Sequence, residues 1–69
     1  KGIILSPTRE LCIQIHNQLS LLISNSEMNS ASIYGGDSFE KQKKKLLKGV
    51  DVIVGTPGRV FDHISQGNI

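Results

Sequence analysis

The sequence is poor in residue types that build several common kinds of structure. Its 69 residues include one cysteine and no tryptophan. The lone cysteine, Cys12, excludes a disulfide within the chain and is compatible with a reducing compartment. No apolar run approaches the length that spans a membrane, and the start of the chain carries no signal-peptide pattern. We therefore expect an intracellular, cytoplasmic protein without a membrane partner, and leave a nuclear location open.

Motifs that hold nucleotides or metals are missing as well. The chain has no G-x-x-x-x-G-K-[ST], so no segment can cradle a triphosphate as a P-loop does. The predicted strand Val50–Val54 continues into Gly55-Thr56 rather than into carboxylates that would hold Mg²⁺. Cys12 and His16 are one helical turn apart, but two ligands are too few for a closed metal site. We predict no catalytic, cofactor-binding or metal-binding residue in this chain.

Length and charge limit what the chain can do alone. A chain of this size buries only about 60% of its unfolded surface, which makes it marginal as an independent domain. It begins with Lys-Gly directly before a predicted strand and stops just after a helical pattern, so we expect a piece of a larger α/β domain. The net charge of +2 permits a nucleic-acid partner but does not argue for one by itself.

One sequence device occurs twice. Ser6-Pro7-Thr8-Arg9 follows the apolar run Ile3–Leu5, and Thr56-Pro57-Gly58-Arg59 follows Val52–Val54. A hydroxyl residue followed by proline is typical of a helix start, because the hydroxyl caps a backbone N–H and proline has no N–H to lose. We therefore predict helix starts at Ser6-Pro7 and Thr56-Pro57, with Thr8 competing for the capping position in the first copy.

The arginines in these two copies conflict with the local electrostatics. The first turn of a helix carries partial positive charge, so a cation is disfavoured there. A phosphate held jointly by the helix N-terminus and the guanidinium would remove the conflict at Arg9 and at Arg59. The alternative is that both arginines face solvent or pair with carboxylates, Arg9 with Glu10 and Arg59 with Asp62.

Apolar periodicity predicts six elements. Strands are expected at 3–5, 31–34 and 50–54, and helices at 8–24, 38–48 and from 56 onward. The order β-α-β-α-β-α indicates an α/β domain with a parallel sheet, in which the aliphatic run 3–5 is buried on both faces. The residues expected to face inward are Leu11, Ile15, Leu19 and Leu22 in the first helix and Val60, Phe61 and Ile64 in the last. Asp37 and Glu40 are expected to form the N-terminal capping pair of the second helix. Gly49 and Gly67 are expected to end the second and third helices.

Three features fall where the predicted strands end. Ligands of parallel sheets collect at the carboxyl ends of the strands. Residues 7–10, Gly35-Gly36 and residues 56–59 all lie there. A glycine pair is commonly a simple turn, but it also lets a ligand approach backbone N–H groups. The lysines of 41–48 are interpreted as a solvated helix face, with non-specific attraction to phosphates as the alternative.

These segments resemble motifs of the DEAD-box RNA helicases. Pro7-Thr8-Arg9-Glu10-Leu11 is similar to motif Ia, Gly35-Gly36 to the GG motif, and Thr56-Pro57-Gly58-Arg59 to motif Ib. The resemblance covers essentially the whole chain, and three short motifs in order at family-like separations are specific. It implies a partial RecA-like, P-loop NTPase-type sheet, with residues 1–69 forming the middle of the first RecA-like, ATP-binding domain.

The resemblance also implies a function for the parent protein. That protein is expected to be an ATP-dependent RNA helicase that separates short RNA duplexes using ATP hydrolysis. This segment would contact single-stranded or duplex RNA through the phosphate backbone, while ATP and Mg²⁺ would bind outside this chain. Glu10 would orient a neighbouring arginine, with Arg59 as the candidate. The implied RNA-binding residues are Pro7, Thr8, Arg9, Gly35, Gly36, Thr56, Pro57, Gly58 and Arg59.

Departures from the family pattern keep two alternatives open. The Q motif, Walker A, D-E-A-D and S-A-T motifs are not in these residues, so the segment alone should be inactive. One alternative is a catalytically inactive nucleic-acid-binding module of the same fold. The other is an unrelated α/β anion-binding domain whose arginines are structural.

Overall fold

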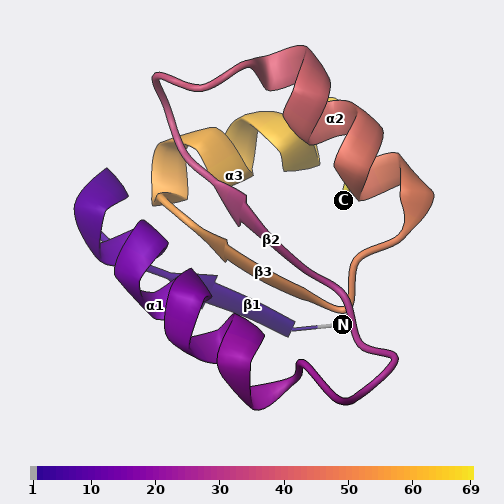
Figure 1. Ribbon diagram of the computed structural model, residues 1–69. Helices are drawn as coiled ribbons and strands as arrows, with labels where there is room; N and C mark the ends of the chain where they lie inside the picture. Colours follow the sequence, from indigo (N-terminus) through magenta and orange to yellow (C-terminus); the bar gives the residue numbers. More distant parts are fainter. Residues whose placement is uncertain (1) are drawn as a thin grey trace.

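A computed structural model describes residues 2–69 as an alternating α/β fold (Figure 1). Its elements are β1 (Gly2–Leu5), α1 (Arg9–Leu22), β2 (Ser30–Ile33), α2 (Phe39–Lys48), β3 (Val52–Gly55) and α3 (Pro57–Ser65). The strands form one parallel sheet in the order β1-β3-β2. The predicted order of elements and the parallel sheet are therefore confirmed, with strand boundaries shifted by one or two residues. No helix among these residues is long and apolar enough to cross a membrane.

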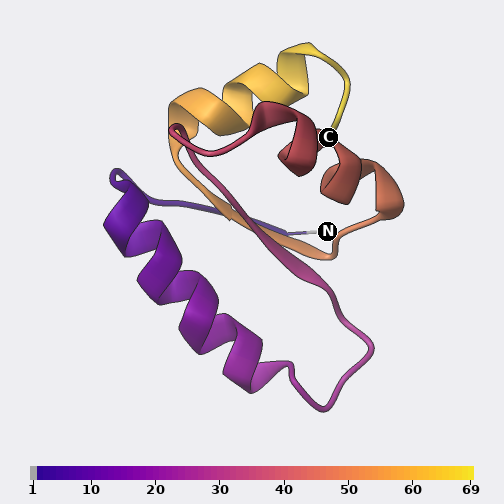
Figure 2. The same ribbon diagram turned by 45° about the horizontal axis from the view of Figure 1, so that its top comes forward.

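The helices cover the two faces of the sheet unequally. Figure 2 shows α1 on one face and α2 with α3 on the other. The core lies on the α2–α3 side, where one buried cluster joins side chains from the sheet and both helices. Its members are Ala31, Ile33, Leu46, Val50, Ile53 and Val60. Because β3 is the middle strand, its side chains contribute to packing on both faces of the sheet.

The first helix does not begin where Ser6-Pro7 predicted. Thr8 is the N-cap, with its Oγ1 accepting from the N–H of Leu11 at 3.2 Å, and the helix starts at Arg9. Ser6 instead extends the sheet, because its N–H donates to the carbonyl of Gly55 at 2.9 Å. A residue used in this way by the ladder is not free to open a helix, so Pro7 only turns the chain between strand and cap.

The other helix signals are mostly confirmed. Thr56 is the N-cap of α3 and Pro57 its first residue, as predicted. Gly49 and Gly67 have φ of 106° and 76° and follow the ends of α2 and α3. The predicted N-cap Asp37 is wrong by one position. Ser38 caps α2, accepting from the N–H of Lys41 at 3.3 Å, while the Asp37 carboxylate accepts from Ser38 N–H.

Burial differs from the sequence prediction in three places. The strand at 3–5 is not buried on both faces: Ile3, Ile4 and Leu5 are 44%, 39% and 57% exposed. The reason is that β1 lies at an edge of the described sheet, while α1 packs against β2 and β3. In α1 the fully buried residue is Cys12, whereas Leu11 and Leu22 are exposed. In α3 the inward residues are Val60 and His63, and Phe61 and Ile64 face outward.

Gly55 lies where the sheet and α3 meet most closely. A Cβ there would clash with Cγ2 of Val60 and lie 2.6 Å from the carbonyl oxygen of Ile33. Because the Ile33 oxygen belongs to the ladder, it cannot move aside cheaply. Only glycine lets β3 run into α3 at this distance.

We expect Gly55→Ala to lower the free energy of unfolding by about 1–3 kcal/mol, the usual cost of overpacking a core. Denaturant unfolding of the full-length protein, followed by circular dichroism, measures this. Gly58→Ala is the matched control, since nothing lies within 4 Å of a Cβ at Gly58. Equal stability of the two variants would contradict the close packing at Gly55.

Candidate functional site

The three segments predicted to form a site gather at one edge of the sheet. Each follows the carboxyl end of a strand: residues 7–10 follow β1, Gly35-Gly36 follows β2, and residues 56–59 follow β3. In Figure 1 the starts of α1 and α3 and the turn after β2 lie together at the left of the sheet. The helices α1 and α3 cover opposite faces, but their N-termini both reach this edge.

Arg9 contacts the turn at Gly35-Gly36, which we call the glycine turn. A Cβ on Gly36 would lie 3.5 Å from Nη1 of Arg9, so the guanidinium lies against the bare backbone of that glycine. Gly36 has φ of 88°, a conformation that favours glycine. Nη2 of Arg9 is 3.6 Å from Oε2 of Glu10, with both side chains more than half exposed. An exposed pair of this kind is weak, so the guanidinium remains open to another anion.

Arg59 reaches the same turn from the other face of the sheet. Its Nη1 donates to the carbonyl of Asp37 at 3.1 Å and to Oε1 of Gln42 at 2.9 Å. Its guanidinium carbon lies 5.5 Å from the ring centroid of Phe39. Within residues 2–69, Arg59 forms no ion pair with Asp62. The guanidinium is thus held in place by neutral groups that leave its charge uncompensated.

Glu10 contacts a different arginine from the one expected. The expectation was that it would orient Arg59, yet the ion partner in the structure is Arg9, its neighbour in the chain. The carboxylate projects from the exposed start of α1, while Arg59 is occupied by Asp37 and Gln42 on the opposite face. Glu10 therefore adjusts the charge beside Arg9 and does not position Arg59.

Gln42 organises this side of the site, although the sequence analysis assigned it no functional role. Its side-chain amide donates to the carbonyl of Tyr34 at 3.0 Å. Its Oε1 accepts from Arg59 and lies 3.0 Å from Nε2 of His63. The signal that could have revealed it is a glutamine on the buried stripe of a helix, since a buried amide needs partners.

His63 completes a buried network under Arg59. Its ring stacks on Phe39 with centroids 4.1 Å apart, and its Nδ1 lies 3.0 Å from the side-chain amide of Asn68. The geometry assigns the neutral ring with the proton on Nε2, because Gln42 Oε1 must accept and Asn68 must donate. Burial, and secondarily the charge of Arg59, lower the pKa of His63 below its usual value of 6.5, against a smaller opposing effect of Asp62.

The start of α3 also keeps backbone donors available. Thr56 makes no side-chain capping bond, so the first N–H groups of α3 have no cap from that hydroxyl. Pro57 has no N–H, which leaves Gly58 and Arg59 as the first donors. Two guanidinium groups, one glycine turn and one uncapped helix start thus lie at a single edge. This combination can hold an anion, and it provides no nucleophile or general base.

Protonation of His63 should be coupled to stability. A pKa that is lower in the folded state means that the unfolded state takes up a proton first as the pH falls. The contribution of the neutral ring is therefore present above pH 6.5 and is lost as the pH falls toward the folded-state pKa. We expect the melting temperature of the full-length protein to fall as the pH is lowered from about 7.5 to about 5, and to fall less steeply in His63→Gln than in the wild type. Identical slopes for the two proteins would contradict the neutral, network-bound ring.

Comparison with protein families gives one match over the whole chain. The family model described as DEAD/DEAH box helicase matches residues 1–69. Among curated proteins, the chain is 46% identical over 67 residues to the ATP-dependent RNA helicase RhlB of Pasteurella multocida, covering 97% of this chain and 16% of that protein. It is 49% identical over 69 residues to RhlB of Psychromonas ingrahamii, covering 100% of this chain and 16% of that protein.

Solved structures show the same likeness in three dimensions. A hypothetical ATP-dependent RNA helicase from Sulfolobus tokodaii superposes with a TM-score of 0.92 at 32% identity, over 100% of this chain and 20% of that chain. The yeast DEAD-box splicing factor Prp28 superposes with a TM-score of 0.90 at 35% identity, over 100% of this chain and 16% of that chain. The chain therefore spans about a sixth to a fifth of the length of these relatives.

Proposed function

We propose that this chain, which belongs to the DEAD/DEAH box helicase family, is one segment of an ATP-dependent RNA helicase. This segment holds the RNA phosphate backbone. Its place is the middle of the first RecA-like, ATP-binding domain. The parent protein hydrolyses ATP, with Mg²⁺, through segments outside these residues, and uses the energy to separate short RNA duplexes. The segment alone has no nucleotide-binding motif and is inactive by itself.

One observation carries this proposal. Arg9 lies against Gly36 and Arg59 bonds to the carbonyl of Asp37, so two guanidinium groups flank the same turn. Within residues 2–69, neither charge is neutralised by a buried carboxylate, and the ion pair between Arg9 and Glu10 is exposed. A chain of phosphates crossing the turn would meet both cations and the backbone N–H of Gly36.

The roles of the contributing residues follow from their positions. Arg9 and Arg59 supply charge, Thr8 and Thr56 begin the helices, and Gly36 exposes backbone to the ligand. Phosphate contacts of this kind fix the register of the RNA but carry no sequence information. The proposed RNA-binding set is Pro7, Thr8, Arg9, Gly35, Gly36, Thr56, Pro57, Gly58 and Arg59.

A salt titration of RNA binding tests the arginines. We expect Arg9→Ala and Arg59→Ala in the full-length protein to weaken binding to RNAs of different sequence alike. Each should lower the slope of log K against log salt by about one unit, because each removes one phosphate contact. Fluorescence anisotropy with labelled oligonucleotides measures both quantities.

Lys48→Ala is the matched control, since it removes one positive charge at the far end of α2. It should leave the slope near the wild-type value. Arg59→Ala also loses bonds to Asp37 and Gln42, so its unfolding is measured in parallel. Wild-type slopes for both arginine variants would end the phosphate assignment.

The glycine turn gives an independent test of the same site. Gly36→Ala places a methyl group against Arg9 at a φ of 88°, which is strained for any residue with a Cβ. We expect ATP hydrolysis without RNA to be unchanged and its stimulation by RNA to fall severalfold. Gly67→Ala is the matched control, because Gly67 has a φ of 76°, has nothing within 4 Å of a Cβ and lies outside the proposed RNA-binding set. An unchanged RNA stimulation in Gly36→Ala would show that the RNA does not approach this turn.

A further inference from the structure

The positive charge of the chain is concentrated on α2, away from the edge described above. Five of the 8 basic residues lie on this helix. Four of them, which we call the lysine row, recur at helical spacing and line one hollow: Lys41, Lys44, Lys45 and Lys48. Within residues 2–69, no member of the row forms an ion pair with a carboxylate. The row is therefore a set of uncompensated cations on one side of a single helix.

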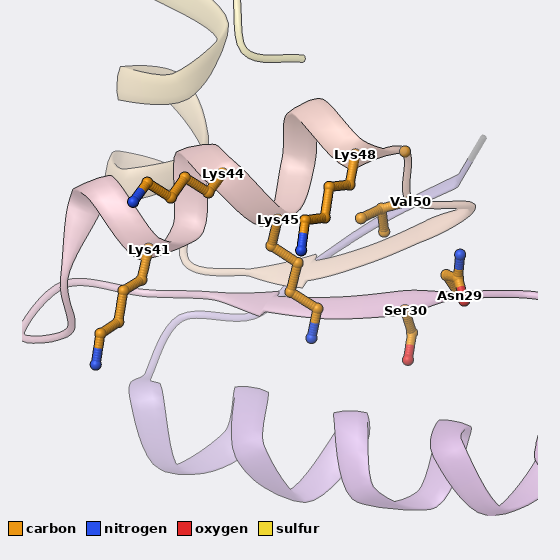
Figure 3. A pocket seen from close by; sticks show the side chains of 8 residues that line it. Asn29, Ser30, Lys41, Lys44, Lys45, Lys48 and Val50 are labelled. Carbon is orange, nitrogen blue, oxygen red and sulfur yellow. The ribbon is translucent and has the colours of Figure 1, made fainter.

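The hollow beneath the lysine row follows the edge of the sheet. It has a volume of about 520 Å³, and its other walls are Asn29, Ser30, Gly49 and Val50. A second hollow of about 140 Å³ is lined by Ser32, Ile33, Lys41 and Lys45, and also by Asp37 and Gln42. Figure 3 shows Lys41, Lys45 and Lys48 extending from α2 toward β2. The two hollows share Lys41 and Lys45 and lie beside the first and second halves of β2, and we call them together the β2 groove.

Among residues 2–69, one edge of the strand beside this groove has no partner strand. β2 pairs only with β3 in the described sheet. The carbonyls of Asn29 and Ile33 accept from the N–H groups of Val52 and Thr56, so these residues point their backbone groups toward β3. Backbone groups alternate along a strand, and those of Ser30 and Ser32 therefore point outward. An unpaired edge of this kind is a template for a further strand.

We propose that the β2 groove binds an extended acidic segment of a partner protein, which adds to the sheet beside β2. Alternate side chains of a strand recur about every 6.6–6.8 Å on one face. Residues four apart on a helix are about 6 Å apart along its axis. Carboxylates at alternate positions of the added strand thus match Lys41 and Lys45, while its backbone bonds to Ser30 and Ser32.

The lysine row also determines which strands are accepted. Lysines at a sheet edge repel basic strands. A neutral strand would remove water from the lysine charges without replacing it by an opposite charge. Many proteins keep sheet edges unpaired with lysines in this way. β2 itself, Ser30–Ile33, carries no acidic residue, so a second copy of this strand is rejected. The same lysines attract an acidic strand. The lysine row therefore distinguishes acidic partners from basic ones.

An extended peptide suits the β2 groove better than RNA does. The residues that line it include no arginine and no aromatic side chain, and so offer no platform for stacking bases. The larger hollow lies beside the amino end of β2, at Asn29 and Ser30, whereas Arg9 and Arg59 lie beyond the carboxyl ends of the strands. The outward N–H and C=O groups of β2 have the spacing along the chain that the backbone of another strand can pair with one after another.

Binding of designed peptides to the full-length protein tests the charge requirement. The probe is a labelled short peptide in which Glu and Val alternate, and its control replaces each Glu by Lys. We expect the acidic peptide alone to bind in fluorescence anisotropy, and Lys41→Ala and Lys45→Ala each to weaken it about two- to fivefold. Lys43→Ala, on the same helix but outside the lysine row, should bind as the wild type. Equal binding of both peptides, or an equal effect of Lys43→Ala, would overturn the proposal.

Hydrogen exchange tests whether the peptide joins the sheet. On binding, the outward amides of Ser30 and Ser32 should exchange more slowly. The amides of Ala31 and Ile33, which face β3, provide the internal control and should change little. Binding without protection of Ser30 and Ser32 would show a surface charge contact and refute strand addition.

Competition by RNA separates this proposal from the phosphate site. The Arg9→Ala protein should bind the acidic peptide as the wild type does. If unlabelled single-stranded RNA displaces the peptide from Arg9→Ala, the lysine row is an RNA surface and the peptide proposal is overturned. If Arg9→Ala and Arg59→Ala both bind RNA with the wild-type affinity and salt slope, the phosphate site fails while the peptide result is unaffected.

Discussion

The parallel ladder through β3 is the constraint on which the rest of the structure depends. β3 pairs with β1 on one side and β2 on the other, and Gly55 lies opposite both Leu5 and Ile33. Because the three strands run in one direction and end at the same level, the segments that follow them begin at one edge. Residues that are far apart in sequence are thus brought together by the backbone alone. The absence of a side chain at Gly55 lets α3 start immediately at this edge.

A buried polar network then fixes what the ladder brings together. Gln42 links the carbonyl of Tyr34, the guanidinium of Arg59 and the ring of His63, and so ties the glycine turn to α2 and α3. Networks of this kind stabilise one arrangement because each member would be left unsatisfied in another. They also explain how a cation is tolerated in the first turn of α3. Its nitrogen Nη1 is bound by neutral oxygens, and within residues 2–69 Nε and Nη2 have no protein acceptor.

Local periodicity and strand-end signals predicted the alternating α/β order, the parallel sheet and the edge at which the three candidate segments meet. The RecA-like class came from the resemblance of three short motifs to those of a known family. The local signals were less successful wherever tertiary contacts compete with a local preference. Ser6-Pro7 is typical of a helix start, but the N–H of Ser6 bonds to the carbonyl of Gly55 in the sheet, and Thr8 is the N-cap instead. Phe61 reads as core, but α3 turns His63 inward because Gln42 and Asn68 satisfy its ring. A pairing between residues 21 positions apart leaves no periodic trace in the sequence.

The two arginines are not equivalent, although the sequence presents them as copies. Arg59 is fixed by two hydrogen bonds and by the ring of Phe39, so its position is set before any ligand arrives. Within residues 2–69, Arg9 is restrained by an exposed contact with Glu10 and by packing against Gly36. A fixed cation defines where an anion sits at little entropic cost, whereas a mobile one loses rotamer freedom on binding. In the proposed RNA complex we therefore expect Arg59 to set the register of the phosphate chain and Arg9 to adjust to its path across the glycine turn.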